Sequence, residues 1–149
     1  CIVPENRKEI TTEGGLNLKK FKKKIKYVVN SLNRKNIRTS LFINPTLSDV
    51  KISKEINSNC IELHTGQISN LIKNNLKYTK DFKKIKLCSK YAKSIGLEVH
   101  AGHGMNYKTA KILSKINEID EFNIGHFIVG ESIIYGLKKT IHNFKKILK

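Results

Sequence analysis

The feature that most constrains the fold is a repeated alternation between short β-rich runs and longer amphipathic segments. The β-rich runs fall at residues 1–3, 40–43, 60–63, 97–101 and 122–125. Apolar residues three and four positions apart predict helices at 18–32, 47–56, 78–95 and 107–116, a short helical piece after 130 and a terminal helix from 137 to 148. Repeated strand–helix units favour parallel strands joined by crossover helices.

The length of the chain limits what this α/β pattern can form. Its 149 residues are enough for a single domain with a real core, which we predict over 1–149. Five parallel strands fit an open doubly wound sheet or part of a barrel. No Gly-x-Gly-x-x-Gly turn follows the first run, which disfavours a dinucleotide-binding domain. A complete (β/α)8 barrel typically needs ~250 residues, and the chain begins with Cys1 inside an apolar run, so we expect a truncated sequence.

The formal charge of +17 raises the alternative of a non-catalytic basic α/β module that binds RNA or another polyanion. The kind of basic residue argues against it, because Arg7, Arg34 and Arg38 are the only arginines. Arginine is the preferred reader of phosphates and bases, and the sequence offers no aromatic stacking platform. Lysine runs on helical patterns are typical of solvated faces. We therefore expect no nucleic-acid partner.

The cysteines and the hydropathy indicate the compartment. Cys1, Cys60 and Cys88 are widely spaced and form no CxxC pair, so the cysteines suggest no zinc site. A reduced, cytoplasmic location is the simplest interpretation. No uninterrupted apolar stretch reaches the ~18–20 residues of a membrane span, so no membrane partner is expected.

Three consecutive strands end in residues that can carry chemistry. They contribute Glu62 and His64, then His100 and His103, then His126. In parallel barrels the carboxyl ends of the strands and the following loops build the active site, and a carboxylate with imidazoles can perform acid–base catalysis there. Gly104, Gly125 and the segment 130–132 suit phosphate binding if they belong to the last two strands of a barrel.

Each of these residues also has a structural interpretation. A single histidine at a strand end is more often structural than catalytic, and the glycines could simply permit tight turns. Glu62 lies in an apolar run, where a carboxylate needs either a function or an ion pair with a neighbouring strand. His103 lies between two glycines and is the stronger candidate, whereas His142 is expected on the surface of the terminal helix. Three histidines could also hold a metal, but the pattern lacks a ligand cluster.

Together these motifs resemble one family, pyridoxine 5'-phosphate synthase. The resemblance spans essentially the whole chain in order and at matching spacing. It rests on Val-Pro-Glu at 3–5, Thr-Thr-Glu-Gly-Gly-Leu at 11–16, Ser-Leu-Phe-Ile at 40–43, Ile-Glu-Leu-His-Thr-Gly at 61–66, Ala-Gly-His-Gly at 101–104 and Asn-Ile-Gly-His at 123–126. It implies a (β/α)8 TIM barrel of which the chain covers strands four to eight, without the first three βα units.

The resemblance also implies a reaction and roles. The family condenses 3-amino-2-oxopropyl phosphate with 1-deoxy-D-xylulose 5-phosphate in vitamin B6 biosynthesis, without a cofactor, and assembles as a homo-octamer. It implies that His103 donates a proton, that Glu62 stabilises transition states and that Thr11 contacts the deoxyxylulose phosphate. Gly104, Gly125 and His126 would bind the amino-ketone phosphate, and residues 9–15 would form a mobile loop. A different phosphosugar barrel enzyme is less favoured, because no strand ends in a candidate Schiff-base lysine.

Overall fold

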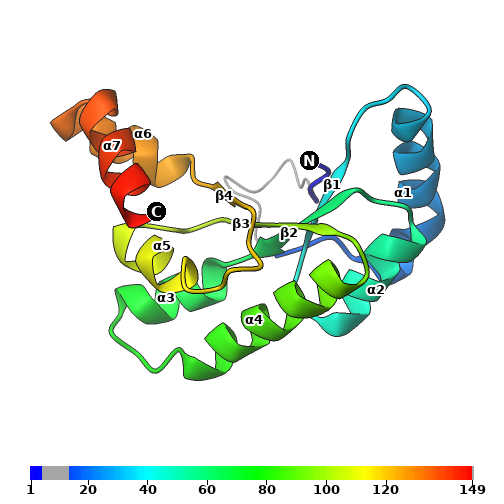
Figure 1. Ribbon diagram of the computed structural model, residues 1–149, viewed down its shortest axis with the longest axis horizontal. Helices are drawn as coiled ribbons and strands as arrows, with labels where there is room; N and C mark the ends of the chain where they lie inside the picture. The colour runs from blue at the N-terminus through cyan, green and yellow to red at the C-terminus, as the bar shows by residue number, and fades with distance from the viewer. Residues whose placement is uncertain (5–13, 149) are drawn as a thin grey trace.

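A computed structural model describes residues 1–4 and 14–148 and contains one parallel sheet (Figure 1). The strands lie side by side in the order β1-β2-β3-β4. They are β1 (Ser40–Ile43), β2 (Cys60–His64), β3 (Glu98–Gly102) and β4 (Glu121–Asn123). The run predicted at 1–3 contributes only an isolated parallel bridge, Ile2 to Leu41. The predicted α/β class and the parallel arrangement are confirmed.

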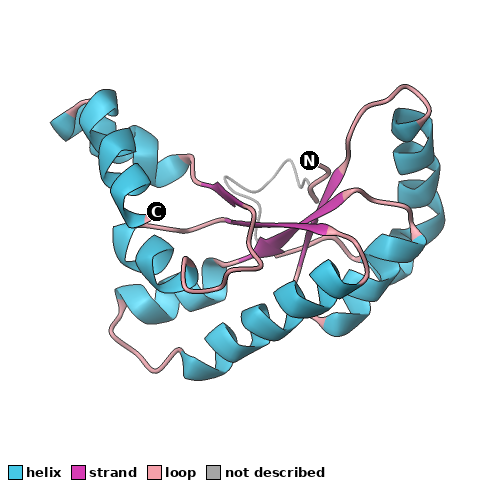
Figure 2. Cartoon of the chain, in the orientation of Figure 1, coloured by secondary structure: helices cyan, strands magenta, loops and turns pink. Residues whose placement is uncertain are grey.

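Helices separate the successive strands, with two helices after β2 and two after β4, as can be followed in Figure 2. They are α1 (Leu18–Asn33), α2 (Leu47–Glu55), α3 (Gly66–Lys73), α4 (Thr79–Ser94), α5 (Tyr107–Leu113), α6 (His126–Tyr135) and α7 (Leu137–Ile147). The sequence pattern had not identified α3. Among the described residues, no helix is long and apolar enough to cross a membrane.

The start of α6 corrects a prediction. A helix was expected only after Gly130, but α6 begins at His126 and contains Gly130 in its interior. The strand predicted up to 125 consequently ends at Asn123. An interior glycine costs a helix only ~1 kcal/mol, so Gly130 does not prevent the earlier start.

The two faces of the sheet differ in polarity. Side chains alternate along a strand, so one face carries the apolar positions of every strand, and these join the main core with residues of the helices. The apolar face consists of Leu41, Ile43, Ile61, Leu63, Val99, Ala101 and Phe122. The opposite, polar face consists of Ser40, Phe42, Cys60, Glu62, His64, Glu98, His100, Gly102, Glu121 and Asn123. The chemistry predicted at the strand ends therefore lies on the face without the main apolar core.

An aromatic cluster holds the last two helices against α5. The ring centroid of Tyr107, at the start of α5, lies 4.5 Å from that of Phe144 on α7 and 5.0 Å from that of Phe127 on α6. Asn106 caps α5, as predicted, because its side chain accepts a hydrogen bond from the Thr109 amide at 2.9 Å. This packing fixes the N-terminus of α6 beside the ends of β3 and β4.

Candidate active site

The carboxyl ends of three strands meet at one edge of the polar face. His64, Gly102 and Asn123 are register partners across β2, β3 and β4. A cleft of about 740 Å³ opens at this edge. Its lining includes Phe42, Glu62, His103, Gly104, Asn123, Gly125 and His126. The structure thus brings together all the predicted site residues that it describes, as the sequence predicted for strand ends of a parallel sheet.

The side-chain amide of Asn123, and not a cation, holds the Glu62 carboxylate in the cleft. Its Oε2 accepts a hydrogen bond of 2.7 Å from Asn123 Nδ2, and the Cys1 thiol approaches the same oxygen at 3.5 Å. Burial raises the pKa of the Glu62 carboxyl above its ordinary value, although the Asn123 hydrogen bond opposes this shift. The ion pair considered as a structural role for Glu62 is not formed with any described residue.

Gly102 makes room for this carboxylate. A Cβ atom at position 102 would lie 1.9 Å from Glu62 Oε1, so the carboxylate could not keep its present position beside a larger residue. The sequence contains this glycine within Ala-Gly-His-Gly. The contact of Gly102 with the Glu62 side chain depends on how β2 pairs with β3, so it could not be derived from the spacing of residues.

His103 follows β3 with an unusual backbone. Its φ of 81° lies in the left-handed region, and Gly104 continues there with φ 73°. This conformation costs a non-glycine residue ~1–2 kcal/mol. Thr65 compensates, because its hydroxyl is placed to donate to the carbonyl oxygens of Gly102 at 2.8 Å and His103 at 2.7 Å. The turn after β2 therefore fixes where the His103 imidazole stands, and Thr65 is a positioning residue that sequence reasoning missed.

His64 packs directly beside His103. The ring centroids are 4.8 Å apart, and Phe42 meets the His64 ring edge-on at 5.2 Å. The buried Nε2 of His64 has no hydrogen-bond partner among the described residues. Burial, together with the neighbouring His103, lowers the pKa of His64 to about 4. His64 is therefore neutral near pH 7.

The N-terminus of α6 faces the other side of the cleft. Gly125 is its N-cap residue and His126 its first helical residue, and both are exposed. Residues 130–132, considered for phosphate binding, lie inside α6 and are not among the residues that line the cleft. Gly104 has a φ of 73°, a conformation that favours glycine, and a Cβ there would also crowd Ser69 Cβ at 3.3 Å.

Thr11 and most of the predicted mobile loop lie outside the described residues. The described end of that loop is anchored at β1, where the Gly15 amide donates to Asn44 Oδ1 at 3.0 Å. A Cβ at Gly15 would lie 2.3 Å from the backbone nitrogen of Asn44, so only glycine allows the two backbone segments to pack this closely. The loop consequently joins the fold at the same edge of the sheet as the cleft.

Comparison with known sequences identifies the family. The profile of the family described as "Pyridoxal phosphate biosynthesis protein PdxJ" matches residues 1–149. The chain belongs to the PdxJ family. The resemblance deduced from the motifs is therefore confirmed.

Individual PdxJ relatives agree with this assignment. The chain is 65% identical over 147 residues to a pyridoxine 5'-phosphate synthase of Pelagibacter ubique, covering 99% of this chain and 62% of the relative. It is 40% identical to the synthase of Aliarcobacter butzleri over 99% of the chain and 65% of the relative. It is 45% identical to that of Prochlorococcus marinus subsp. pastoris over 99% of the chain and 61% of the relative. The chain thus spans about three-fifths of the length of these PdxJ relatives.

Proposed function

We propose that this chain carries acid–base and phosphate-binding groups of a pyridoxine 5'-phosphate synthase. The reaction condenses 3-amino-2-oxopropyl phosphate with 1-deoxy-D-xylulose 5-phosphate to give pyridoxine 5'-phosphate, inorganic phosphate and water. The observation that carries the proposal is the placement of Glu62 and His103 in one cleft beside the N-terminus of α6. The names of the relatives support the same reaction.

His103 is the proton donor in this proposal, and Glu62 stabilises the charge that develops during ring closure. Ring closure requires repeated proton transfers and carbonyl condensation, which imidazoles and carboxylates can promote. The proposed role of His103 is supported by its fixed backbone and its open position in the cleft. Burial raises the pKa of Glu62, which indicates a partly desolvated site, where a carboxylate acts more strongly on charge in a bound group than it would in water.

The amino-ketone phosphate is proposed to bind at Gly104, Gly125 and His126. Helix α6 is ten residues long, and its free amides and partial positive charge face the cleft at Gly125. His126 stands beside these amides and could donate a further hydrogen bond. Thr11 is proposed to contact the deoxyxylulose phosphate, by family resemblance alone.

The decisive test is product formation by the full protein from the two substrates, with Glu62→Gln as the variant. This change keeps the shape and one acceptor for Asn123 but removes the charge. We expect product from the wild type and a large loss of turnover in the variant, with an unchanged unfolding temperature. Absence of product from the folded wild-type protein would refute the proposed reaction.

The phosphate assignment has its own test in Gly125→Val. A Cβ at Gly125 meets no described atom within 4 Å, and its φ of −104° suits any residue, so the fold itself tolerates a side chain there. We expect a higher KM for the amino-ketone phosphate and an unchanged KM for the deoxyxylulose phosphate. An unchanged KM for both would mean that the phosphate binds elsewhere.

Three wider features are proposed with this function. We propose that residues 1–149 form one domain whose sheet belongs to a (β/α)8 barrel, with the apolar face outward under the helices and the polar face inward.

We propose a homo-octamer, which the exposed Val129, Ile133 and Ile134 on α6 support as candidates for a covered surface. The three free cysteines support a cytoplasmic location. Light scattering of the full protein would test the octamer.

A further inference from the structure

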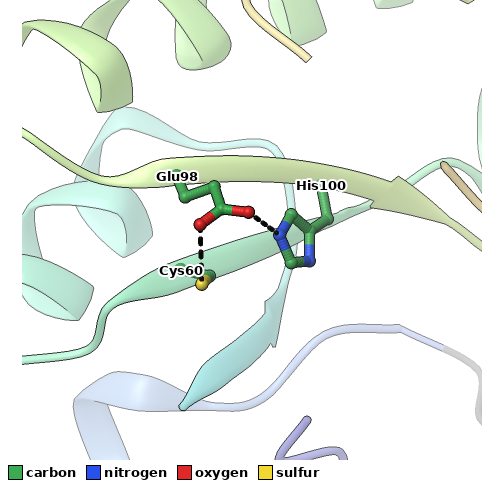
Figure 3. Close-up of side chains that lie close together, drawn as sticks. All are labelled: Cys60, Glu98 and His100. Carbon is green, nitrogen blue, oxygen red and sulfur yellow. Dashed lines mark hydrogen bonds and ion pairs between the residues drawn. The ribbon is translucent and has the colours of Figure 1, made fainter. Parts of the chain in front are cut away.

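A second cluster of reactive side chains lies at the opposite end of the polar face. Cys60 and Glu98 are register partners at the starts of β2 and β3, and His100 follows two residues later on the same face. Figure 3 shows the three side chains pointing toward one another from adjacent strands. Their potential ligand atoms all lie within 4.8 Å of one another. Nothing in the proposed synthase reaction uses this cluster.

The separations of these atoms suit a single metal ion. Cys60 Sγ lies 3.7 Å from Glu98 Oε2, and His100 Nε2 lies 3.0 Å from Glu98 Oε1. Ligand atoms around a tetrahedral zinc ion are separated by about 3.3–3.6 Å, given bond lengths of about 2.0–2.3 Å. Small side-chain rotations would therefore place all three atoms in coordination.

The surroundings supply the outer contacts that such a site needs. Glu121 Oε1 lies 3.7 Å from His100 Nδ1, which favours a proton on that nitrogen. Nε2 is then the nitrogen that would bind the metal, and the ion would replace its present hydrogen bond of 3.0 Å with Glu98 Oε1. Arg38 Nη1 donates to Glu98 Oε2 at 2.7 Å, so Oε1 is the coordinating oxygen. A rotation of the carboxylate must therefore bring Oε1 toward Cys60 Sγ, which now contacts Oε2 at 3.7 Å. A Zn²⁺ ion with the Cys60 thiolate, Glu98, Glu121 and Arg38 sums to zero charge, so the cluster tolerates a divalent ion in spite of the arginine.

Burial distinguishes this cluster from a group of acidic residues on the protein surface. Cys60 is fully buried and His100 is 3% exposed, whereas the Glu98 side chain is 34% exposed. Two ligands are thus preorganised inside the fold, and the third opens a path to solvent. Mixed sulfur, nitrogen and oxygen ligands are typical of zinc.

We propose that Cys60, Glu98 and His100 bind one zinc ion at the amino ends of β2 and β3, with water as the fourth ligand. The ion replaces the thiol proton of Cys60 and ties the two strands together at the end remote from the cleft. Its role is structural. This differs from the sequence-based expectation of no metal, because strand pairing joins residues that are 38 positions apart.

Cobalt titration of the full protein, after chelator treatment and removal of any affinity tag, tests the site. Cobalt bound to thiolate absorbs in the near ultraviolet, so the signal reports the sulfur directly. We expect one equivalent of Co²⁺ to produce this band and Zn²⁺ to abolish it by displacement. Zn²⁺ should also raise the unfolding temperature of the apoprotein.

Variants assign the ligands. Cys60→Ser should remove the band, and Glu121→Gln should weaken Zn²⁺ binding by about tenfold through its outer contact with His100. Cys88→Ser is the matched control, because Cys88 is also buried and its pKa is raised to about 11 by burial, as that of Cys60 is. Circular dichroism identifies any variant that fails to fold. Absence of a sulfur–cobalt band in the folded wild type, or the same band in Cys60→Ser, would reduce the cluster to a hydrogen-bonded network.

Discussion

The two ends of the polar face use similar residues in opposite ways. At the carboxyl ends of the strands, His64 Nε2 has no hydrogen-bond partner in the part of the chain that the structure describes, and His103 faces an open cleft. At the amino ends, His100 lies between two carboxylates, with Glu98 at 3.0 Å and Glu121 at 3.7 Å. The carboxyl end is therefore left available to a substrate, whereas the side chains at the amino end contact one another and form the proposed zinc site.

The two glutamates of this face show the same contrast. Burial raises the pKa of Glu62, whose partner is a neutral amide. Hydrogen bonding to His100, with the charge of Arg38 nearby, lowers the pKa of Glu98 despite some burial. Surroundings, and not residue type, thus separate a group suited to catalysis from one suited to structure.

The largest expected effect comes from comparing His103→Asn with His100→Asn. A positioned acid or base contributes ~10²–10⁴-fold in rate, so His103→Asn should lower turnover by that factor with little change in KM or unfolding temperature. His100→Asn should lower the unfolding temperature and leave turnover nearly unchanged, because it removes a buried partner of two carboxylates. Turnover and thermal unfolding of both variants are the measurements. A near-normal turnover in His103→Asn would exclude proton donation by this residue.

Gly102→Ala should break the geometry of the cleft. The added Cβ would overlap Glu62 Oε1, so the carboxylate must move, which we expect to cost ~1–3 kcal/mol of unfolding free energy and most of the turnover. Gly130→Ala is the control, because a Cβ there meets nothing within 4 Å in the interior of α6. It should stabilise the protein by ~0.5–1 kcal/mol. Equal stability of the two variants would contradict the close contact at Gly102.

His64 should make the protein sensitive to acid. An unfolded histidine takes up a proton near pH 6.5, whereas folded His64 resists protonation until about pH 4. Between these values the unfolded state binds more protons, so the free energy of unfolding falls as the pH decreases. We expect this loss, roughly 2 kcal/mol after allowance for partial exposure, to be absent in His64→Gln.

The control for this measurement is His142→Gln, which changes an exposed histidine on α7. Chemical denaturation at several pH values would give the unfolding free energies. If wild type and His64→Gln lost stability in parallel between pH 6.5 and 4, the imidazole would not be buried in its neutral form.

The smallest effect belongs to Arg38 at the amino end. Its side chain is 57% exposed although it pairs with Glu98 at 2.7 Å, and exposed ion pairs contribute at most about 1 kcal/mol. Arg38→Gln should therefore lower the unfolding free energy by less than about 1 kcal/mol, less still at high salt, and leave turnover unchanged. A large loss of turnover would show that the two ends of the face are coupled.

Local patterns predicted the elements well, because they depend on neighbouring residues. The strand at 40–43 and the cap at Asn106 were correct. Helix α3 was missed, since it lasts only eight residues and begins at a glycine. The start of α6 was misplaced because its apolar run resembles a continuing strand, while the aromatic contact of Phe127 with Tyr107 that holds it is tertiary.

The candidate site likewise contains residues that the sequence could locate and supporting contacts that it could not. Glu62 and His103 could be predicted, because parallel strand ends converge. Their supports could not, since Thr65 reaches the His103 carbonyl across 38 positions and Asn123 reaches Glu62 across 61. Register across the sheet, which no single segment encodes, decides both contacts and the Cys60 cluster.

The contact between Gly102 and the Glu62 carboxylate has an evolutionary consequence. The two positions share one volume, so they cannot drift independently while Glu62 keeps its present rotamer. A larger residue could enter at 102 only if the Glu62 carboxylate moved or position 62 had first shortened, and either change would remove the carboxylate from its present place in the cleft. Descendants that keep the carboxylate in this place would inherit both residues as a linked pair.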